Sequence, residues 1–358
     1  MPELITLSGV GGKTPAAFLV KSQEHSILLD IGEGPEPGVL PDFTGIDRVD
    51  AVLLSHAHVD HVGGLALLPN LGNPEVYASQ ATWELMPEAP VADTQRRILP
   101  VSGQISLCGT QITMGQTGHA PGGLWFHLGT GRSLIYMGDH SEESPVLPYE
   151  APPAAHTVIV DASYGDRNTD LETQLDALEN AAKGGAVIAV PIGGRGPDLV
   201  IALQARGLPV KVDEQVAREL AFLTKNLHLA NSQVHGDLAK AVNTPRADQD
   251  AKPSDVIIAV GPNADYGLAQ SLAEATDEPF RFVFTGFVPQ NSPAKRLIET
   301  GRGEWLPWNV HPRMKDVIKL VEQTGAKQVV PAFVDPNKAT HLFNTLGNRI
   351  CLDRAIKL

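Results

Sequence analysis

Residues 53–64 read Leu-Leu-Ser-His-Ala-His-Val-Asp-His-Val-Gly-Gly, so three imidazoles and one carboxylate fall within six consecutive positions. The apolar segment 49–55 leads into them and predicts a buried strand. Neutral imidazole nitrogens and carboxylate oxygens are the donors that Zn²⁺ and similar cations take. A loop after a strand can aim such side chains at one ion or at two. A merely polar, histidine-rich loop is the alternative, and the spacing favours a metal site.

The pattern His-x-His-x-Asp-His at residues 56–61, set after a strand and followed by two glycines, resembles the signature of the metallo-β-lactamase superfamily. The resemblance implies two β-sheets that face each other between outer helices. It also implies a metal site at one edge of this sandwich, built from loops at strand ends. Further ligands are then expected downstream.

The downstream sequence supplies candidates for these ligands. A histidine follows the alternating segment 111–117, and a carboxylate follows the apolar segment 133–138. By the resemblance, three histidines hold one metal ion, an Asp-His pair holds a second, and another aspartate bridges the two. In that order the residues are His56, His58 and His119, then Asp60 and His61, then Asp139. Asp30 is expected to support a ligand as its hydrogen-bond partner.

Three of these positions also have ordinary structural roles open to them. His119 fits a histidine at a strand end, Asp139 a helix N-cap and Asp30 a turn residue. Their order and placement relative to the 56–61 cluster favour metal binding. His140 stays outside the expected ligand set, because the resemblance puts the ligand at the preceding carboxylate. The implied cofactor is Zn²⁺, as one ion or two.

Composition limits the class of protein. The chain has 358 residues, 42% of them hydrophobic, which is enough for one large domain with an insertion or for two ordinary domains. Two cysteines give no disulfide framework, and no signal-like start or membrane-length apolar stretch is present, so a cytoplasmic protein without a membrane partner is expected. The net charge of −13 argues against a large constitutive nucleic-acid surface, because phosphate binding depends mainly on Lys and Arg.

From residue 157 onward, apolar strands alternate with amphipathic helices, which predicts a parallel sheet covered by helices. Successive strand-and-turn segments resemble the landmarks of the β-CASP insertion, which RNA- and DNA-processing members of the superfamily carry. These segments are 184–196, 209–213, 256–261 and 282–287. The implied fold class is α/β, a metallo-β-lactamase αββα sandwich with an inserted β-CASP-like α/β domain. The expected bounds are 1–165 with 308–358 for the sandwich and 166–307 for the insertion.

Three positions decide how much of that branch's chemistry the resemblance carries over. Asp161 stands where the branch keeps an acidic residue, and His311 where it keeps a histidine that contacts the scissile phosphate. A carboxylate can orient an imidazole that protonates a departing oxygen. Ala332 departs from the pattern, because RNA-cleaving members place there the histidine that completes the second metal site. DNA-directed members carry a small aliphatic residue at that place. Asp335 and His341 are the nearby candidates for the missing ligand.

The first functional hypothesis is a zinc-dependent phosphodiesterase or nuclease that acts on RNA or DNA. Asp60 would orient a metal-activated water, and His311, steered by Asp161, would protonate the leaving group. Arg195 is a candidate phosphate clamp, with a solvated or structural arginine as the alternative. The second hypothesis is a small-molecule metallo-hydrolase for an ester, lactone, thioester or cyclic nucleotide, which suits the acidic charge. The third is a catalytically weakened binder of nucleic acid or a partner. A homodimer is expected by analogy with the branch.

Overall fold

The computed structural model describes residues 2–86, 90–248, 250–275, 277 and 279–358. The chain divides into two compact units, and each is described here by itself. The first unit holds Met1–Glu142, Tyr149–Asn168 and His311–Leu358, and the second holds Glu143–Pro148 and Thr169–Val310. The domain bounds expected from the sequence stay a prediction. In the described part of the chain, no helix is both long and apolar enough to cross a bilayer.

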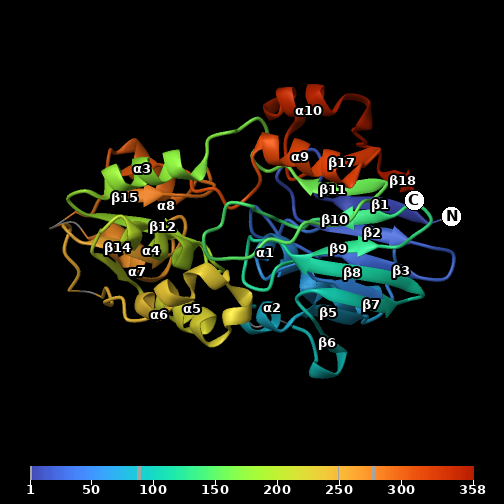
Figure 1. Cartoon of the computed structure of the whole chain (residues 1–358), viewed down its shortest axis with the longest axis horizontal. Helices are drawn as coiled ribbons and strands as arrows, with labels where there is room; N and C mark the ends of the chain where they lie inside the picture. The colour runs from blue at the N-terminus through green and yellow to red at the C-terminus, as the bar shows by residue number, and fades with distance from the viewer. Residues whose placement is uncertain (1, 87–89, 249, 276, 278) are drawn as a thin grey trace. The chain divides into compact units, whose positions relative to one another are not determined.

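Seven strands of the first unit form a mixed sheet in the order β18-β1-β2-β3-β4-β5-β6 (Figure 1). In chain order they are β1 (Glu3–Ser8), β2 (Ala17–Lys21), β3 (Ser26–Leu29), β4 (Ala51–Leu53), β5 (Glu75–Ser79), β6 (Arg96–Leu99) and β18 (Ala355–Lys357). The strands from β3 to β6 run parallel, which brings the ends of β3 and β4 to the same edge of the sheet.

Six further strands form a second sheet in the order β17-β11-β10-β9-β8-β7. They are β7 (Gly103–Leu107), β8 (Thr110–Gln116), β9 (Leu124–Leu128), β10 (Leu134–Tyr136), β11 (Thr157–Asp161) and β17 (Gln328–Ala332). The inner faces of the two sheets share one apolar core, in which Phe18 and Leu29 of the first sheet join Phe126 and Ile159 of the second. The sheets therefore face each other as the two inner layers of a sandwich.

Helices cover both outer faces of this sandwich. On the second sheet, Val158 and Val329 pack with Leu320 of α9 (Met314–Thr324) and with α10 (Thr340–Leu346). On the first sheet, Leu28 and Val52 pack with the 3₁₀ helix η1 (Gly63–Leu71), near α1 (Val59–Val62) and α2 (Gln80–Leu85). Shorter 3₁₀ helices are η2 (Asp93–Gln95), η5 (Pro336–Lys338) and η6 (Gly347–Arg349). The αββα sandwich predicted from the sequence is confirmed.

The second unit is built on a five-stranded, fully parallel sheet in the order β13-β14-β12-β15-β16. The strands are β12 (Ala186–Val190), β13 (Val210–Val212), β14 (Val256–Val260), β15 (Phe282–Phe284) and β16 (Gly303–Trp305). The helices are α3 (Leu171–Ala182), α4 (Arg195–Ala205), α5 (Glu214–Lys225), α6 (His235–Ala241), α7 (Gly267–Glu274) and α8 (Pro293–Glu299), with η3 (Leu227–Leu229) and η4 (Ser232–Val234) between α5 and α6. This is the inserted α/β domain that the sequence predicts.

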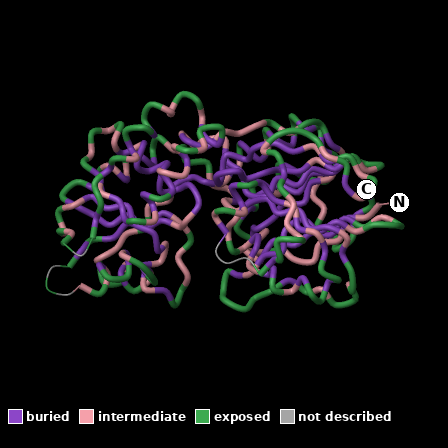
Figure 2. Tube along the Cα trace, turned by 90° about the horizontal axis from the view of Figure 1, so that it is seen from below, coloured by how far each residue is buried: buried purple, intermediate pink, exposed green. Residues whose placement is uncertain are grey.

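Burial follows the strands in both units (Figure 2). Every residue of β12 and β14 is buried, as expected for central parallel strands with helices on both faces. The chain enters this sheet at β12, adds β13 and β14 on one side, and then adds β15 and β16 on the other. Strand order therefore reverses at β12, where open α/β sheets commonly bind their ligands.

Candidate metal centre

Segments that follow β4, β8 and β10, the last residue of β11 and the segment before α9 bring candidate metal-binding side chains of the first unit together. Each residue in these groups offers one donor atom, and within a group all such atoms lie within 4.8 Å of one another. The groups are His56, His58, His119 and Asp139; Asp60, His61 and Asp139; and Asp139, Asp161 and His311. Asp139 belongs to all three, so a single buried carboxylate connects them.

The first group converges on His58. Its Nδ1 lies 3.0 Å from His56 Nε2 and 3.0 Å from His119 Nε2. Asp139 Oδ2 lies 3.5 Å from His119 Nε2 and 3.9 Å from His56 Nε2. One proton on His58 Nδ1 cannot serve both neighbouring nitrogens, whereas one cation accepts all the lone pairs at once. Burial, reinforced by the nearby imidazoles, holds the pKa of His56 well below its usual value and favours the neutral, metal-binding form.

The second group contains two buried atoms aimed at each other without a hydrogen bond. His61 Nε2 lies 3.3 Å from Asp139 Oδ1, and neither atom has a hydrogen-bond partner among the described residues. Buried polar atoms normally find partners, so an unsatisfied pair calls for an explanation. Asp60, partly exposed, adds a carboxylate oxygen to this pair. Imidazole and carboxylate donors of this kind fit a divalent cation.

Asp30 binds the ring of His61 at Nδ1, the nitrogen that does not face Asp139. Its Oδ2 accepts hydrogen bonds from His61 Nδ1 at 2.6 Å, Ser55 Oγ at 2.6 Å and Tyr136 Oη at 2.5 Å, while Oδ1 accepts from Ser55 N at 2.7 Å. With Nδ1 held in this way, Nε2 is the atom left for Asp139 or a cation. Burial alone would lower the pKa of His61, but the charges of Asp139 and Asp30 raise it well above its usual value.

Ser55 and Tyr136 are parts of the site that sequence reasoning missed. Tyr136 is fully buried in β10, and a buried tyrosine hydroxyl needs a polar partner, which was the available signal. That partner, Asp30, stands 106 residues away in the sequence, so local patterns could not name it.

His311 and Asp161 form a close pair beside the first group. His311 Nδ1 lies 2.7 Å from Asp161 Oδ2, and Asp161 Oδ1 also accepts from Ser163 N at 2.9 Å. Burial would raise the pKa of Asp161, but the charge and the hydrogen bond of His311 hold it well below its usual value. The His311 ring centre lies 4.9 Å from that of His119. The structure thus brings the predicted acid–base pair to the ligand cluster.

Tyr164 and Arg167 support this pair from the turn after β11. The Tyr164 ring meets the His311 ring edge-on, with centres 5.1 Å apart. The Arg167 guanidinium lies over the Tyr164 ring, 3.2 Å from its centre. The imidazole of His311 therefore packs against the rings of both His119 and Tyr164. This stacking of Arg167, Tyr164 and His311 was not predicted from the sequence.

Residues 10–193 match the model of a family described as the metallo-β-lactamase superfamily. The chain belongs to this superfamily. It is 27% identical over 346 residues to a ribonuclease of Thermus thermophilus, across 80% of this chain and 79% of the relative. It is 22% identical over 348 residues to an RNase J-like protein of Methanocaldococcus jannaschii, across 84% and 81%. These relatives confirm the predicted β-CASP branch of the metallo-β-lactamase superfamily.

Two further proteins resemble this superfamily member. A transcription termination factor of Methanosarcina mazei is 25% identical over 293 residues, which cover 67% of this chain and 46% of that longer protein. A crystal structure of a protein of unknown function from Enterococcus faecalis aligns over 100% of both chains, with a TM-score of 0.61 and 13% identity. The structural match at this identity is a likeness of fold.

The substituted superfamily position, Ala332, ends β17 and is fully buried. The next residue, Phe333, has φ of 63°, and its ring centre lies 5.4 Å from that of His61. Asp335 accepts hydrogen bonds from the backbone and side chain of Asn337, and His341 is exposed on α10. Neither Asp335 nor His341 belongs to a metal-binding group of the described residues. An aromatic ring, rather than an imidazole ligand, borders the second group on this side.

Arg195, the candidate clamp, belongs to the second unit. It begins α4 and is only 9% exposed, with Nη1 3.5 Å from Thr285 Oγ1. The glycine turn before it is occupied by an internal carboxyl group, because Gly193 N and Gly194 N donate to the side-chain oxygens of Glu219 at 3.2 and 3.0 Å. Burial raises the pKa of Glu219 to about 7. The role of Arg195 toward phosphate stays a prediction.

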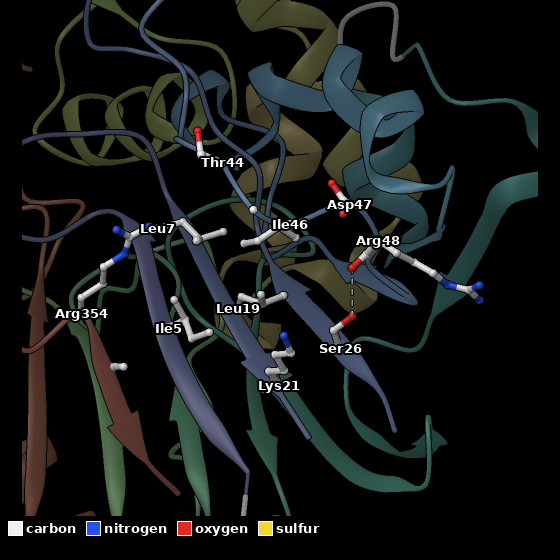
Figure 3. A pocket seen from close by; sticks show the side chains of 12 residues that line it. Ile5, Leu7, Leu19, Lys21, Ser26, Thr44, Ile46, Asp47, Arg48 and Arg354 are labelled. Atoms are coloured by element: carbon white, nitrogen blue, oxygen red, sulfur yellow. Dashed lines mark hydrogen bonds between the residues drawn. The ribbon is translucent and has the colours of Figure 1, made fainter. Parts of the chain in front are cut away.

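A separate hollow of about 550 Å³ lies on the outer face of the first sheet (Figure 3). Ile5, Leu7 and Leu19 form its apolar floor, with Lys21 and Arg354 among the polar residues that line it. Its lining contains none of the histidines or aspartates of the three groups. The candidate metal centre of this superfamily member is therefore a cluster at strand ends and not part of this hollow.

Proposed function

We propose that the chain is a metal-dependent phosphodiesterase of the nuclease type, acting on RNA or DNA. The main support is that two groups of candidate metal-binding side chains and the His311–Asp161 pair all meet at one carboxylate, Asp139. Names of relatives support the substrate class, since one is called a ribonuclease and another an RNase J-like protein. The metal-dependent hydrolase class agrees with the superfamily to which the chain belongs.

A divalent cation, Zn²⁺ in this proposal, fits the donor sets. His56, His58, His119 and Asp139 would hold one ion, while Asp60, His61 and Asp139 would hold a second. Such a cation, when bound, supplies a Lewis acid for a phosphoryl oxygen and makes a water molecule acidic enough to ionise near neutral pH. Asp30 keeps His61 oriented for this task through its bond to Nδ1.

Two side chains handle protons in the proposed reaction. Asp60 is partly exposed, so its carboxylate can accept a hydrogen bond from the attacking water and orient it. His311 donates a proton to the departing oxygen from Nε2, because Nδ1 is engaged with Asp161. Asp161 stabilises the imidazolium and holds its orientation.

Incubation of the metal-loaded protein with labelled single- and double-stranded RNA and DNA tests the proposal. The same preparation is assayed on chromogenic esters, lactones and phosphodiesters, which probes the small-molecule alternative. We expect cleavage of a polynucleotide by the wild type and none by His58→Ala. Wild-type turnover of every polynucleotide no faster than that of His58→Ala would contradict the proposal.

We further propose a cytoplasmic location and a homodimeric state. Support for the location is the pair of cysteines in 358 residues, too few for a disulfide framework. The dimer rests on analogy with the branch. Light scattering of the purified protein measures the mass directly, and a single species of monomer mass would exclude the dimer.

A further inference from the structure

Exposed aromatic side chains are confined to one part of the described chain. Across the described residues, only three aromatic side chains are classed as exposed, and all of them belong to the second unit. They are Tyr266 at 44%, Phe287 at 54% and Trp305 at 50% exposed. Single exposed apolar residues are normal on a protein surface, but a group gathered at one place calls for an explanation.

The three rings share one edge of the parallel sheet. Trp305 is the last residue of β16, Phe287 stands three residues beyond the end of β15, and Tyr266 six residues beyond the end of β14. Carboxyl ends of parallel strands lie at the same edge of a sheet. In the order β14-β12-β15-β16 the outermost strands are three strand spacings apart, roughly 14 Å. That length accommodates several bases stacked about 3.4 Å apart.

Trp305 is held so that an apolar ring surface stays exposed. Its Nε1 donates to the carbonyl oxygen of Gly286 at 2.8 Å, so its one polar atom is already satisfied. The register pairs Trp305 with Phe284, and Gly286 directly precedes Phe287. The indole and the phenyl group thus come from adjacent chain segments at the same edge.

Strand β12, which lies between β14 and β15, is followed by a positively charged side chain, Arg195. Arg195 follows β12, and its Nη1 lies 3.5 Å from Thr285 Oγ1, which itself donates to Ala189 O at 3.1 Å. These contacts join the loops after β12 and β15 at the place where strand order reverses, the usual ligand-binding edge of open α/β sheets. The guanidinium of Arg195, a residue only 9% exposed, supplies positive charge at an edge that also carries the carboxyl groups of Asp213 and Asp265 near Tyr266.

We propose that this aromatic edge, defined as Tyr266, Phe287 and Trp305, is a stacking surface for the unpaired bases of a single-stranded nucleic acid. The inference deepens the proposed function, on which its ligand class rests. Every base has an apolar face that can stack on an aromatic side chain, so such a surface tolerates any sequence. A duplex hides these faces, and the edge therefore selects single strands.

Fluorescence anisotropy of a short, phosphorothioate-linked single strand, which resists hydrolysis, measures binding to the full metal-loaded chain. We expect Trp305→Ala and Phe287→Ala each to weaken binding roughly five- to tenfold. Ile98→Ala is the matched control, because Ile98 is 66% exposed in the first unit and distant in sequence from the edge. Unchanged affinity of both aromatic variants would overturn the inference.

Two further measurements separate stacking from other causes. An abasic strand of equal length keeps the phosphates but lacks bases, so we expect it to bind the wild type more weakly than the normal strand binds Trp305→Ala, which retains two of the three rings. Trp305→Phe retains a ring and should keep most of the affinity for the normal strand. Thermal unfolding checks that Trp305→Ala and Trp305→Phe are folded. Equal binding of the abasic and normal strands would also overturn the inference. Binding without cleavage of ordinary RNA or DNA would contradict the proposed function alone.

Discussion

At the residue scale, Asp30 is the buried carboxylate that contacts His61 of the second candidate donor group. It accepts four hydrogen bonds, from Ser55, His61 and Tyr136, and is itself fully buried. We expect Asp30→Asn to lower metal affinity roughly 10- to 100-fold, because an amide cannot accept all of these bonds and His61 loses its orientation. Metal titration followed by calorimetry measures the change.

The control for this change is Asp42→Asn, since Asp42 is exposed and lies in a loop outside the ligand groups. Its metal affinity should equal that of the wild type. If Asp30→Asn also binds metal as tightly as the wild type, Asp30 has no supporting role.

A second residue-scale prediction concerns His311. Removal of a general acid slows the step in which the leaving oxygen departs, so His311→Ala should lower kcat roughly 10²- to 10⁴-fold on RNA or DNA. A nitrophenolate leaving group departs without a proton, so the kcat of His311→Ala on a nitrophenyl phosphodiester should fall much less. Steady-state kinetics on both substrates provide the comparison, with exposed His341→Ala as the control. Equal losses on both substrates would argue against proton donation.

Local spacing singled out the candidate metal donors of residues 56–61, and distance along the chain explains the contacts that it could not predict. Residues 56–61 are recognisable as a candidate metal site because four side chains with metal-binding donor atoms fall within six positions. The contact of Tyr136 with Asp30 spans 106 positions, and the packing of Phe333 against His61 depends on a strand from the far end of the chain. No periodicity within one segment encodes such contacts.

At the element scale, the loop after β4 lies directly on Gly32. A Cβ at Gly32 would lie 1.8 Å from the carbonyl oxygen of Asp60 and 2.9 Å from Ala16 N. We expect Gly32→Ala to destabilise the fold by about 1–3 kcal/mol or more, and to reduce bound metal, because the ligand loop must move. Gly12→Ala is the matched control, since nothing lies within 4 Å of its Cβ. Equal thermal stability of the two variants would contradict this packing argument.

The buried contact between α5 and the turn before α4 makes stability depend on pH. Burial raises the pKa of Glu219 from 4.5 to about 7, so the folded unit favours the protonated form. Its contribution to the free energy of unfolding is full below about pH 4.5 and is lost as pH rises through about 7. The total effect is at most about 3 kcal/mol.

Thermal unfolding at several pH values, compared between wild type and Glu219→Gln, tests this dependence. The wild type should lose more stability than the variant as pH rises through about 7. Glu214→Gln on the same helix is exposed and should follow the wild type. Parallel curves for wild type and Glu219→Gln would refute the assignment.

Elements were the easiest level to predict, for a physical reason. The strands β12 and β14 are continuous apolar runs buried on both faces, and α3 begins at Asp170, which caps it by accepting from Thr173 N. Such signals lie within a few residues. Arg195 was predicted from the sequence as a candidate phosphate clamp, but the occupation of the preceding turn by Glu219, 25 residues from Gly194, follows only from the packing of α5.

At the scale of the whole molecule, metal binding and stability are linked. The proposed ligands follow β4, β8 and β10 and come from distant segments, so a cation held by them would bind the folded chain and not the unfolded one. Chelation should lower Tm, because metal at 100-fold above Kd adds about 2.7 kcal/mol to the free energy of unfolding. Calorimetry with and without a chelator measures the shift. The Tm of His58→Ala should fall less on chelation than the Tm of the wild type. An unchanged wild-type Tm would show that no stabilising metal was bound.

The arrangement of the first unit along the chain bears on the order of its synthesis. The histidines of the 56–61 cluster leave the ribosome about 250 residues before His311, and β17 follows later still. A nascent chain therefore carries the proposed cation ligands long before it carries the proposed proton donor. With the roles proposed above, hydrolysis has to wait until the segment that carries His311 has been made.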